Sequence, residues 1–180
     1  MKKLVLIPLA MFVLVAIASA QMAGGKKPAS PPANAECKFS NGKTIKIDYS
    51  SPRAKGRKIF GSGDALVPYG EVWRTGANDA TTFVTTANLN VGGKDVPAGN
   101  YTIFTVPKAD QWMLIINKKT GEWGIPYKYE SDELGRVPMT VSKTSGPVEN
   151  FTIAFDQAGS KCTLRMEWEN TRASVDVSEK

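Results

Sequence analysis

Short runs in which apolar and polar side chains alternate fill the chain from Ala35 onward, with turn-forming residues between them. In the run 43–49, two isoleucines and a tyrosine share one face, as in a strand with one buried side. The Asn41-Gly42 dipeptide separates this run from residues 37–40 and favours a two-residue hairpin turn. No later stretch sustains the apolar period of about 3.6 residues that an amphipathic helix shows, which argues against a helical fold.

Further strands are expected in runs with the same alternation, at residues 81–86, 89–91, 101–106, 111–117, 140–143, 150–155, 161–168 and 175–177. Gly92-Gly93 and Ser145-Gly146-Pro147 are the expected turns between neighbouring runs. About ten evenly spaced strands predict an all-β fold, either an antiparallel β-sandwich or a jelly-roll-like barrel. Residues 130–134 could form one helical turn.

The first twenty residues have the pattern of a secretory signal peptide. Two lysines precede an apolar run at 4–17, and Ala18-Ser19-Ala20 is a small-residue cleavage site. A membrane anchor is less favoured, because the run is shorter than the roughly 20 residues that span a bilayer. Residues 21–34 are rich in Ala, Gly and Pro and are expected to be a flexible linker. A single domain over 35–180 is therefore expected to be exported, to the periplasm or beyond.

Two cysteines in an exported chain suggest one disulfide. Cys37 and Cys162 each alternate with apolar residues, so both are expected to point toward a core. The alternative is a pair of buried free thiols.

The composition excludes several classes of function. The chain contains no histidine, which removes Ser-His-Asp triads, Cys-His dyads and histidine metal ligands. We expect no cofactor and no metal. The formal charge of +6 includes four lysines within the first 27 residues, so little excess remains on the domain. Neither nucleic acid nor, after cleavage of the signal peptide, a membrane is expected as a partner.

Two irregular segments interrupt the strand pattern, and the first of them, 51–78, is rich in cations and glycines. Its candidate ligand-binding residues are Arg53, Lys55, Arg57, Arg74 and Asn78. Arginine forks suit carboxylate, phosphate or sulfate groups, and glycines let backbone amides approach an anion. In the alternative, Arg74 pairs with an internal acid, Trp73 fills the core and the other cations are solvated.

The second irregular segment, 118–138, carries the candidates Trp123 and Tyr127. Exposed aromatic side chains can stack on sugar rings, since they offer flat apolar area with a polar tip. The alternative is a loop folded over the core.

These residues favour a non-catalytic module that binds an anionic small molecule or a glycan through the two irregular segments. One alternative is a hydrolase that acts on a glycan with Glu71 and Asp79 as its acid and base, because paired carboxylates need no histidine. Another is an envelope interaction protein, which an exposed strand edge or apolar patch would favour.

Two motifs carry a resemblance to a known family: Ser51-Pro52 followed by Lys55-Gly56-Arg57, and the run Val-Trp-Arg-Thr-Gly-Ala-Asn at 72–78. Matching positions continue through Pro97-Ala98-Gly99 to Gly121–Gly124. The chain resembles a family of secreted bacterial proteins catalogued only as a domain of unknown function. The resemblance implies an exported β-rich domain and supplies no activity, substrate or catalytic residue.

Overall fold

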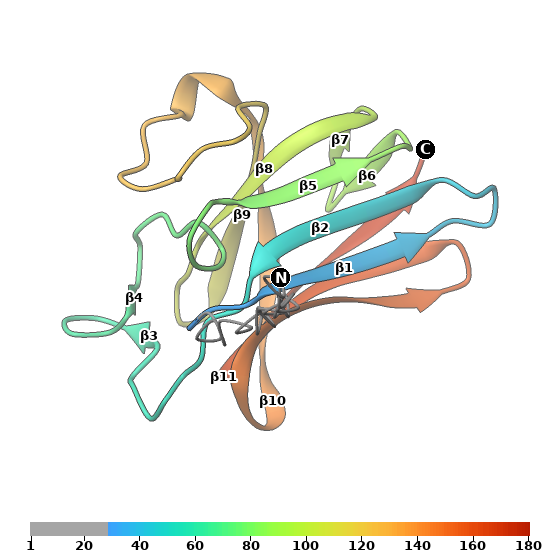
Figure 1. Ribbon diagram of the computed structural model, residues 1–180. Helices are drawn as coiled ribbons and strands as arrows, with labels where there is room; N and C mark the ends of the chain where they lie inside the picture. The colour runs from blue at the N-terminus through green and yellow to red at the C-terminus, as the bar shows by residue number, and fades with distance from the viewer. Residues whose placement is uncertain (1–28) are drawn as a thin grey trace, which may run out of the picture.

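Eleven strands and one short 3-10 helix make up the computed structural model, which describes residues 29–180 (Figure 1). The elements are β1 (Pro32–Lys38), β2 (Thr44–Ser50), β3 (Phe60–Gly61), β4 (Val67–Pro68), β5 (Thr81–Thr85), β6 (Leu89–Val91), β7 (Lys94–Val96), β8 (Gly99–Val106), β9 (Gln111–Asn117), η1 (Glu130–Asp132), β10 (Glu133–Ala158) and β11 (Lys161–Glu179). The described residues contain no α-helix, and none of their helices is long and apolar enough to cross a membrane. The predicted all-β class is confirmed, and η1 is the helical turn expected near residue 130.

Nine strands form one sheet in the order β1-β2-β5-β8-β9-β10-β11-β6-β7, and every pair in it is antiparallel. The Asn41-Gly42 turn joins β1 to β2, with Gly42 at a φ of 86°. Gly92-Gly93 joins β6 to β7 with both φ angles positive, as a tight hairpin turn requires. Both predicted hairpins are therefore confirmed. The first, however, has a loop of three residues, 40–42, and not two, because the Phe39 backbone N–H donates to the Lys43 carbonyl at 2.8 Å.

β10 and β11 are longer than the alternation predicts. The runs 140–143 and 150–155 both belong to β10, and Ser145-Gly146-Pro147 lies in an irregularity of the pairing rather than in a chain reversal. The start of β10 pairs with β9, whereas its end pairs with the start of β11. The sheet thereby curls until β1 and β2 lie over β10 and β11, which gives a sandwich-like fold and no closed barrel (Figure 1).

The N-terminal boundary differs slightly from the expected one. β1 begins at Pro32, so the last residues of the expected linker pair with β2, where Pro32 lies opposite Ser50. The expected signal peptide and the remainder of the expected linker, up to residue 28, lie outside the described residues.

Burial follows the strand period wherever one side of the sheet faces water. In β2 the buried positions Ile45, Ile47 and Tyr49 alternate with exposed Lys46 and Asp48. The inner faces enclose one large core. The predicted disulfide is confirmed: Cys37 of β1 and Cys162 of β11 are bonded within this core, with 6.5 Å between their Cα atoms.

The central strands β8 and β9 are covered on both faces. The main core lies on one face, and a smaller cluster on the other face holds part of the second irregular segment. Phe104 and Ile115 point away from the main core into a smaller cluster. Tyr127 and Tyr129 of the second irregular segment complete that cluster, with the Tyr127 ring centroid 4.8 Å from that of Phe104. Residues 133–138, the end of the expected irregular segment, are instead the start of β10 and pair with β9. The preceding residues, 118–132, contain no strand and are held against the sheet by these aromatic side chains.

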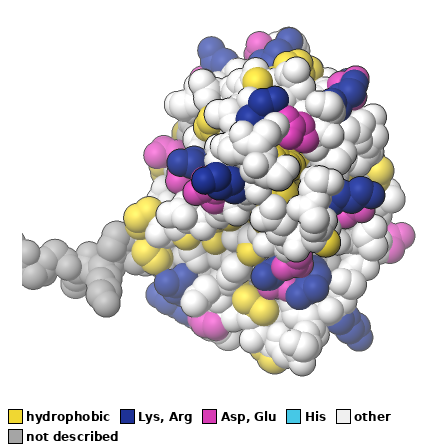
Figure 2. All heavy atoms as spheres, turned by 90° about the vertical axis from the view of Figure 1, so that its right-hand side faces the viewer, with side chains coloured by type: hydrophobic (Ala, Val, Ile, Leu, Met, Phe, Trp, Pro, Cys, Tyr) yellow, Lys and Arg dark blue, Asp and Glu magenta, His cyan; other side chains and the backbone are white. Residues whose placement is uncertain are grey.

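The face at the right of Figure 1 has a different character. Figure 2 shows Lys and Arg side chains interspersed with Asp and Glu there, while hydrophobic side chains are scattered in small groups. Lys43–Glu179 at 2.8 Å and Lys180–Asp95 at 2.7 Å are ion pairs of the exposed strand ends. This mixed surface contrasts with the opposite side, where the irregular segments lie.

Candidate functional site

The two irregular segments lie along the same side of the sheet and together line three adjoining surface hollows. The cation hollow, of about 270 Å³, is lined by Ala29, Ser30, Arg53, Lys55 and Arg57. The central hollow, of about 320 Å³, shares Ser30 and Arg57 with it. The acid hollow, of about 520 Å³, contains Glu71 and Glu130 in its lining. The central and acid hollows share four apolar residues, namely Leu66, Val67, Trp73 and Ile125. Because each hollow shares lining with the next, we treat the three as one groove.

Trp73 forms part of the groove floor and also packs against the main core. Its ring stacks on Trp168 at 5.9 Å between centroids and meets Phe151 edge-on at 4.7 Å. Its indole N–H donates to the Gly76 carbonyl at 3.1 Å. Trp73 is half-buried, because it packs against the core and also lines the groove. The alternative in which Trp73 only fills the core is therefore incomplete.

The chain around Trp73 is fixed by hydrogen bonds at a strained position. Trp73 and Thr105 exchange backbone hydrogen bonds of 2.8 and 2.9 Å, which tie the segment to β8. Thr75 has a φ of 58° although it is β-branched and fully buried. Such strain persists only where the surroundings impose it. Here the Thr75 carbonyl accepts a 2.7 Å hydrogen bond from the Thr81 hydroxyl, and the two hydroxyls of Thr75 and Thr105 lie 3.2 Å apart.

The cation hollow brings together three of the predicted ligand-binding residues. The Arg53 guanidinium donates to the carbonyl and hydroxyl of Ser51, at 3.1 and 2.9 Å. Arg57 donates to the carbonyls of Ala54 and Arg53, at 3.1 and 2.6 Å. These bonds orient the two guanidinium groups without neutralising them. Among residues 29–180, no carboxylate forms a salt bridge with Arg53, Lys55 or Arg57.

An acid does lie near this end of the groove. The Glu149 carboxylate accepts a 2.9 Å hydrogen bond from the backbone N–H of Lys55. This contact orients the turn at Lys55, which has a φ of 50°. It leaves the Lys55 ammonium group without a salt-bridge partner in the described chain.

Arg74 lies in the central hollow and contacts the second irregular segment. Its guanidinium lies over the Trp123 ring at 4.5 Å from the ring centroid, and it donates to the Trp123 carbonyl at 3.4 Å. Burial lowers the pKa of Arg74, and the nearby Asp79 charge opposes that change. The expected alternative, a salt bridge from Arg74 to an internal acid, is absent among the described residues.

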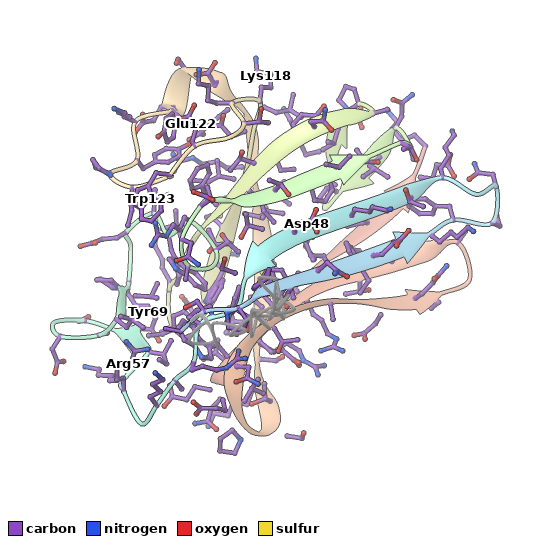
Figure 3. The ribbon with its side chains drawn as sticks, in the orientation of Figure 1. Asp48, Arg57, Tyr69, Lys118, Glu122 and Trp123 are labelled. Carbon is purple, nitrogen blue, oxygen red and sulfur yellow. A yellow bond between two sulfur atoms is a disulfide. The ribbon has the colours of Figure 1, made fainter. Side chains whose placement is uncertain are left out.

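Trp123 is one of four large hydrophobic side chains that are exposed in residues 29–180. The set is Leu66 at 44 %, Tyr69 at 37 %, Trp123 at 55 % and Ile125 at 43 % of their full accessible areas. All four belong to the two irregular segments. Figure 3 shows Trp123, Tyr69 and Arg57 on this side of the molecule, away from Asp48 on the outer surface of β2. Exposed apolar side chains gathered beside unpaired cations are typical of a binding surface.

The remaining predicted residues have structural contacts. The Asn78 side chain donates to the Ser50 hydroxyl at 3.0 Å and to the Ser30 carbonyl at 3.4 Å, and it lines none of the three hollows. Tyr127 lines the acid hollow with part of its ring, but its hydroxyl donates to Glu133 at 2.6 Å. Burial raises the pKa of the Tyr127 hydroxyl, and the Glu133 carboxylate raises it further.

The structure does not bring Glu71 and Asp79, the alternative acid–base pair, into one hollow. Glu71 lines the acid hollow, whereas Asp79 is exposed and lines none of the three hollows. Glu130 lies across the acid hollow from the first segment, in η1. No group of three Asp, Glu or Cys side chains suited to a metal ion occurs in the described chain.

Among the groove residues that the sequence pattern did not single out are Glu130, Leu66 and Ile125. Ile125 is a single apolar residue between Gly124 and Pro126, and an apolar residue outside any alternating run is a sign that its side chain can remain exposed. Leu66 gives no such sign, because it lies in the apolar run Ala65-Leu66-Val67, whose other two members are buried. No local sign paired Glu130 with Glu71, since the two are brought together only by the fold.

The comparisons with known proteins concern the whole domain. A family model described as a protein of unknown function, DUF2911, matches residues 30–177. No curated protein and no solved structure matches the chain. The match covers the whole sheet and both irregular segments, and it confirms the family that the sequence resembles. This chain therefore belongs to the DUF2911 family of proteins of unknown function.

Proposed function

We propose that this protein is an exported, non-catalytic module that binds a ligand in the groove and holds the ligand's anionic group in the cation hollow. The observation that carries the proposal is the cluster of Arg53, Lys55 and Arg57 around one hollow, without a carboxylate partner among residues 29–180. Hydrogen bonds to nearby backbone carbonyls hold the Arg53 and Arg57 guanidinium groups at this hollow.

Pre-orientation makes such a site effective. Arg53 and Arg57 are already fixed by hydrogen bonds to Ser51, Ala54 and the Arg53 carbonyl, so binding an oxyanion costs little additional side-chain entropy. Their remaining N–H groups suit a carboxylate, phosphate or sulfate. Trp123 lines none of the three hollows but lies beside the groove against Arg74, and its exposed face offers a flat apolar area to a sugar or other ring.

Two features support export. The first is the signal-peptide pattern of residues 1–20, and the second is the buried Cys37–Cys162 disulfide, a bond that persists in oxidising compartments. An exported binding module would meet its ligand in the periplasm or in the medium.

Thermal-shift titration with anionic compounds and acidic glycans tests the binding function. We expect a ligand that stabilises the wild type to lose most of that stabilisation with Arg57→Ala and with Arg74→Ala, because both side chains line the central hollow. Lys46→Ala is the matched control, since it removes one exposed positive charge from β2. If both arginine variants fold and keep the full response, the groove is not the site.

A second candidate is a glycan hydrolase that uses two carboxylates. The observation that favours it is that Glu71 and Glu130 line the same hollow, which makes Glu130 the partner in place of Asp79. Such an enzyme would release reducing sugar from a glycan, and Glu71→Gln and Glu130→Gln would each abolish the release while the protein stays folded. Absence of release across neutral and acidic glycans, by a protein that binds them, excludes this candidate.

A further inference from the structure

We propose that the ligand is dipolar, a short apolar peptide with free ends, and that it lies along the groove with its carboxylate in the cation hollow and its amino group in the acid hollow. This inference deepens the proposed ligand-binding function and rests on it. It follows from the order of chemical groups along the three hollows: cations, then apolar side chains, then carboxylates.

The two ends of the groove have opposite charge. The cation hollow is lined by Arg53, Lys55 and Arg57 and by no acid. The acid hollow is lined by Glu71 and Glu130 and by no cation. Neither glutamate forms a salt bridge with any residue that the structure describes. A ligand that is anionic along its whole length would therefore meet repulsion at one end, whereas a ligand with opposite charges at its two ends is attracted at both.

The stretch between the ends is apolar. Leu66, Val67, Trp73 and Ile125 line both the central and the acid hollow, so they form the continuous wall between the charged ends. Leu66 and Ile125 are exposed to solvent, and covering them with aliphatic side chains is favourable in proportion to the apolar area removed from water. An unbranched sugar chain would cover these side chains less well than leucine or valine side chains would.

Arg74 supplies hydrogen bonds in the middle of this wall. Its guanidinium has one hydrogen bond in the described chain, the 3.4 Å contact with the Trp123 carbonyl, and its Cζ lies 4.5 Å from the centroid of the indole ring. Its other N–H groups are available to the carbonyl oxygens of a peptide backbone. A short peptide with free ends thus matches the groove in charge, in apolar content and in hydrogen-bonding groups.

The sign of one charge effect distinguishes this ligand from an acidic glycan. In the double variant Glu71→Gln/Glu130→Gln, a polyanion binds more tightly because a repulsion is removed, whereas a peptide with a free amino group binds less tightly. Both glutamates are exposed, so the variant is expected to fold as the wild type does. Asp48→Asn/Asp110→Asn removes the same charge from exposed positions outside the groove and serves as the control.

The experiment is isothermal titration of the purified protein with tri-leucine, with tri-leucine acetylated at its amino group, and with trigalacturonate. We expect the wild type to bind tri-leucine about tenfold more tightly than the acetylated form, a difference of about 1.4 kcal/mol. In the glutamine double variant that difference disappears, and in Arg57→Ala both peptides bind weakly.

Two further outcomes are separable. If trigalacturonate binds, is lost with Arg57→Ala and tightens in the glutamine variant, while tri-leucine does not bind, the binding function stands and the dipolar ligand is wrong. If none of the three probes binds the wild type at millimolar concentration, the peptide inference is likewise overturned. The Arg57→Ala thermal-shift comparison with a broader set of anions then decides the binding function separately.

Discussion

Gly124 allows the second irregular segment to lie close to Ala80 and Arg74. Its φ is 94°, and a Cβ there would lie 2.9 Å from the Ala80 Cβ and 3.1 Å from the Arg74 Cβ. Gly121, in the same segment, has a φ of 76° but no heavy atom within 4 Å of such a Cβ. Both glycines have a left-handed backbone conformation, but only Gly124 lacks space for a Cβ atom.

Gly124→Ala is therefore expected to cost more stability than Gly121→Ala. The left-handed backbone alone costs about 1–2 kcal/mol, and overpacking adds roughly 1–3 kcal/mol at Gly124. Urea unfolding of the two variants measures the difference directly. Gly124→Ala should also displace Trp123 from Arg74, seen as a change in tryptophan fluorescence that Gly121→Ala lacks. Equal destabilisation by both substitutions would contradict the close approach.

Because of Glu133, the stability of this region is expected to fall at acidic pH. Hydrogen bonds from the Arg136 guanidinium, of 2.8 and 2.9 Å, hold the pKa of the Glu133 carboxyl below its usual value of 4.5, with the Tyr127 hydroxyl adding to the effect. A lowered carboxyl pKa contributes stability that is complete above pH 4.5 and is lost as the pH falls through the folded value.

We expect Glu133→Gln to be less stable than the wild type by about 1 kcal/mol at pH 7, since Arg136 is partly exposed and the pair is screened. The difference should shrink as the pH is lowered from 4.5 toward 3. Urea unfolding at steps of pH follows it, with Asp48→Asn as the control for an exposed carboxylate. A difference that is constant with pH would show that the charge of Glu133 is not involved.

Single residues also show which features of the candidate site could be predicted from the sequence and which could not. Arg57 and Arg53 could be singled out because their density in a glycine-rich segment is local information. Arg74 packs on Trp123 and not on an acid. No local pattern predicts this contact, because the two residues are 49 positions apart in the sequence. Asn78 was assigned to the ligand, but its side chain holds Ser50 and Ser30 in place.

At the scale of elements, the disulfide joins β1, at one end of the sheet order, to the hairpin of β10 and β11. It connects cysteines 125 residues apart, and closure of a loop of that size is assigned about 4–5 kcal/mol by the chain-entropy model. We expect Cys37→Ala/Cys162→Ala to unfold at lower urea, with a loss of about 2–5 kcal/mol. Reductant should destabilise the wild type in the same way and leave the double variant unchanged. A reduced wild type with two titratable thiols and an unaltered midpoint would contradict this.

Turns could be predicted from sequence more reliably than strand ends. Asn41-Gly42 and Gly92-Gly93 specify their hairpins because a positive φ is a local requirement, which Gly42 meets in the first turn and both glycines meet in the second. Ser145-Gly146-Pro147 has similar turn chemistry, yet β10 continues past it, because pairing with β11 resumes on both sides of the irregularity. Long-range pairing thus overrides a local turn signal wherever a partner strand extends past it.

At the scale of the whole molecule, apolar exposure is confined to one side of the described chain. The four exposed large hydrophobic side chains all lie in the two irregular segments, two of them in the groove next to the cation hollow, whereas the face shown in Figure 2 carries ion pairs such as Lys43–Glu179. The alternation of residues predicted the sheet, but it could not predict this distribution, since the groove arises from two segments that the strands β5 to β9 separate in the chain.

Export predicts a defined mature chain. If residues 1–20 are removed on secretion, protein recovered from the periplasm or the medium begins at Gln21. Intact-mass measurement before and after reduction tests this, and reduction should add the two hydrogens of one disulfide. A recovered chain that still begins at Met1 would contradict cleavage.

The bond between Cys37 and Cys162 also has a consequence for protease attack. Both irregular segments, 51–78 and 118–138, lie between the two cysteines in the chain, so each belongs to the covalent ring that the bond closes. A single cut in either exposed segment opens that ring without releasing a fragment. The nicked protein therefore keeps both pieces of its groove attached until the disulfide is reduced.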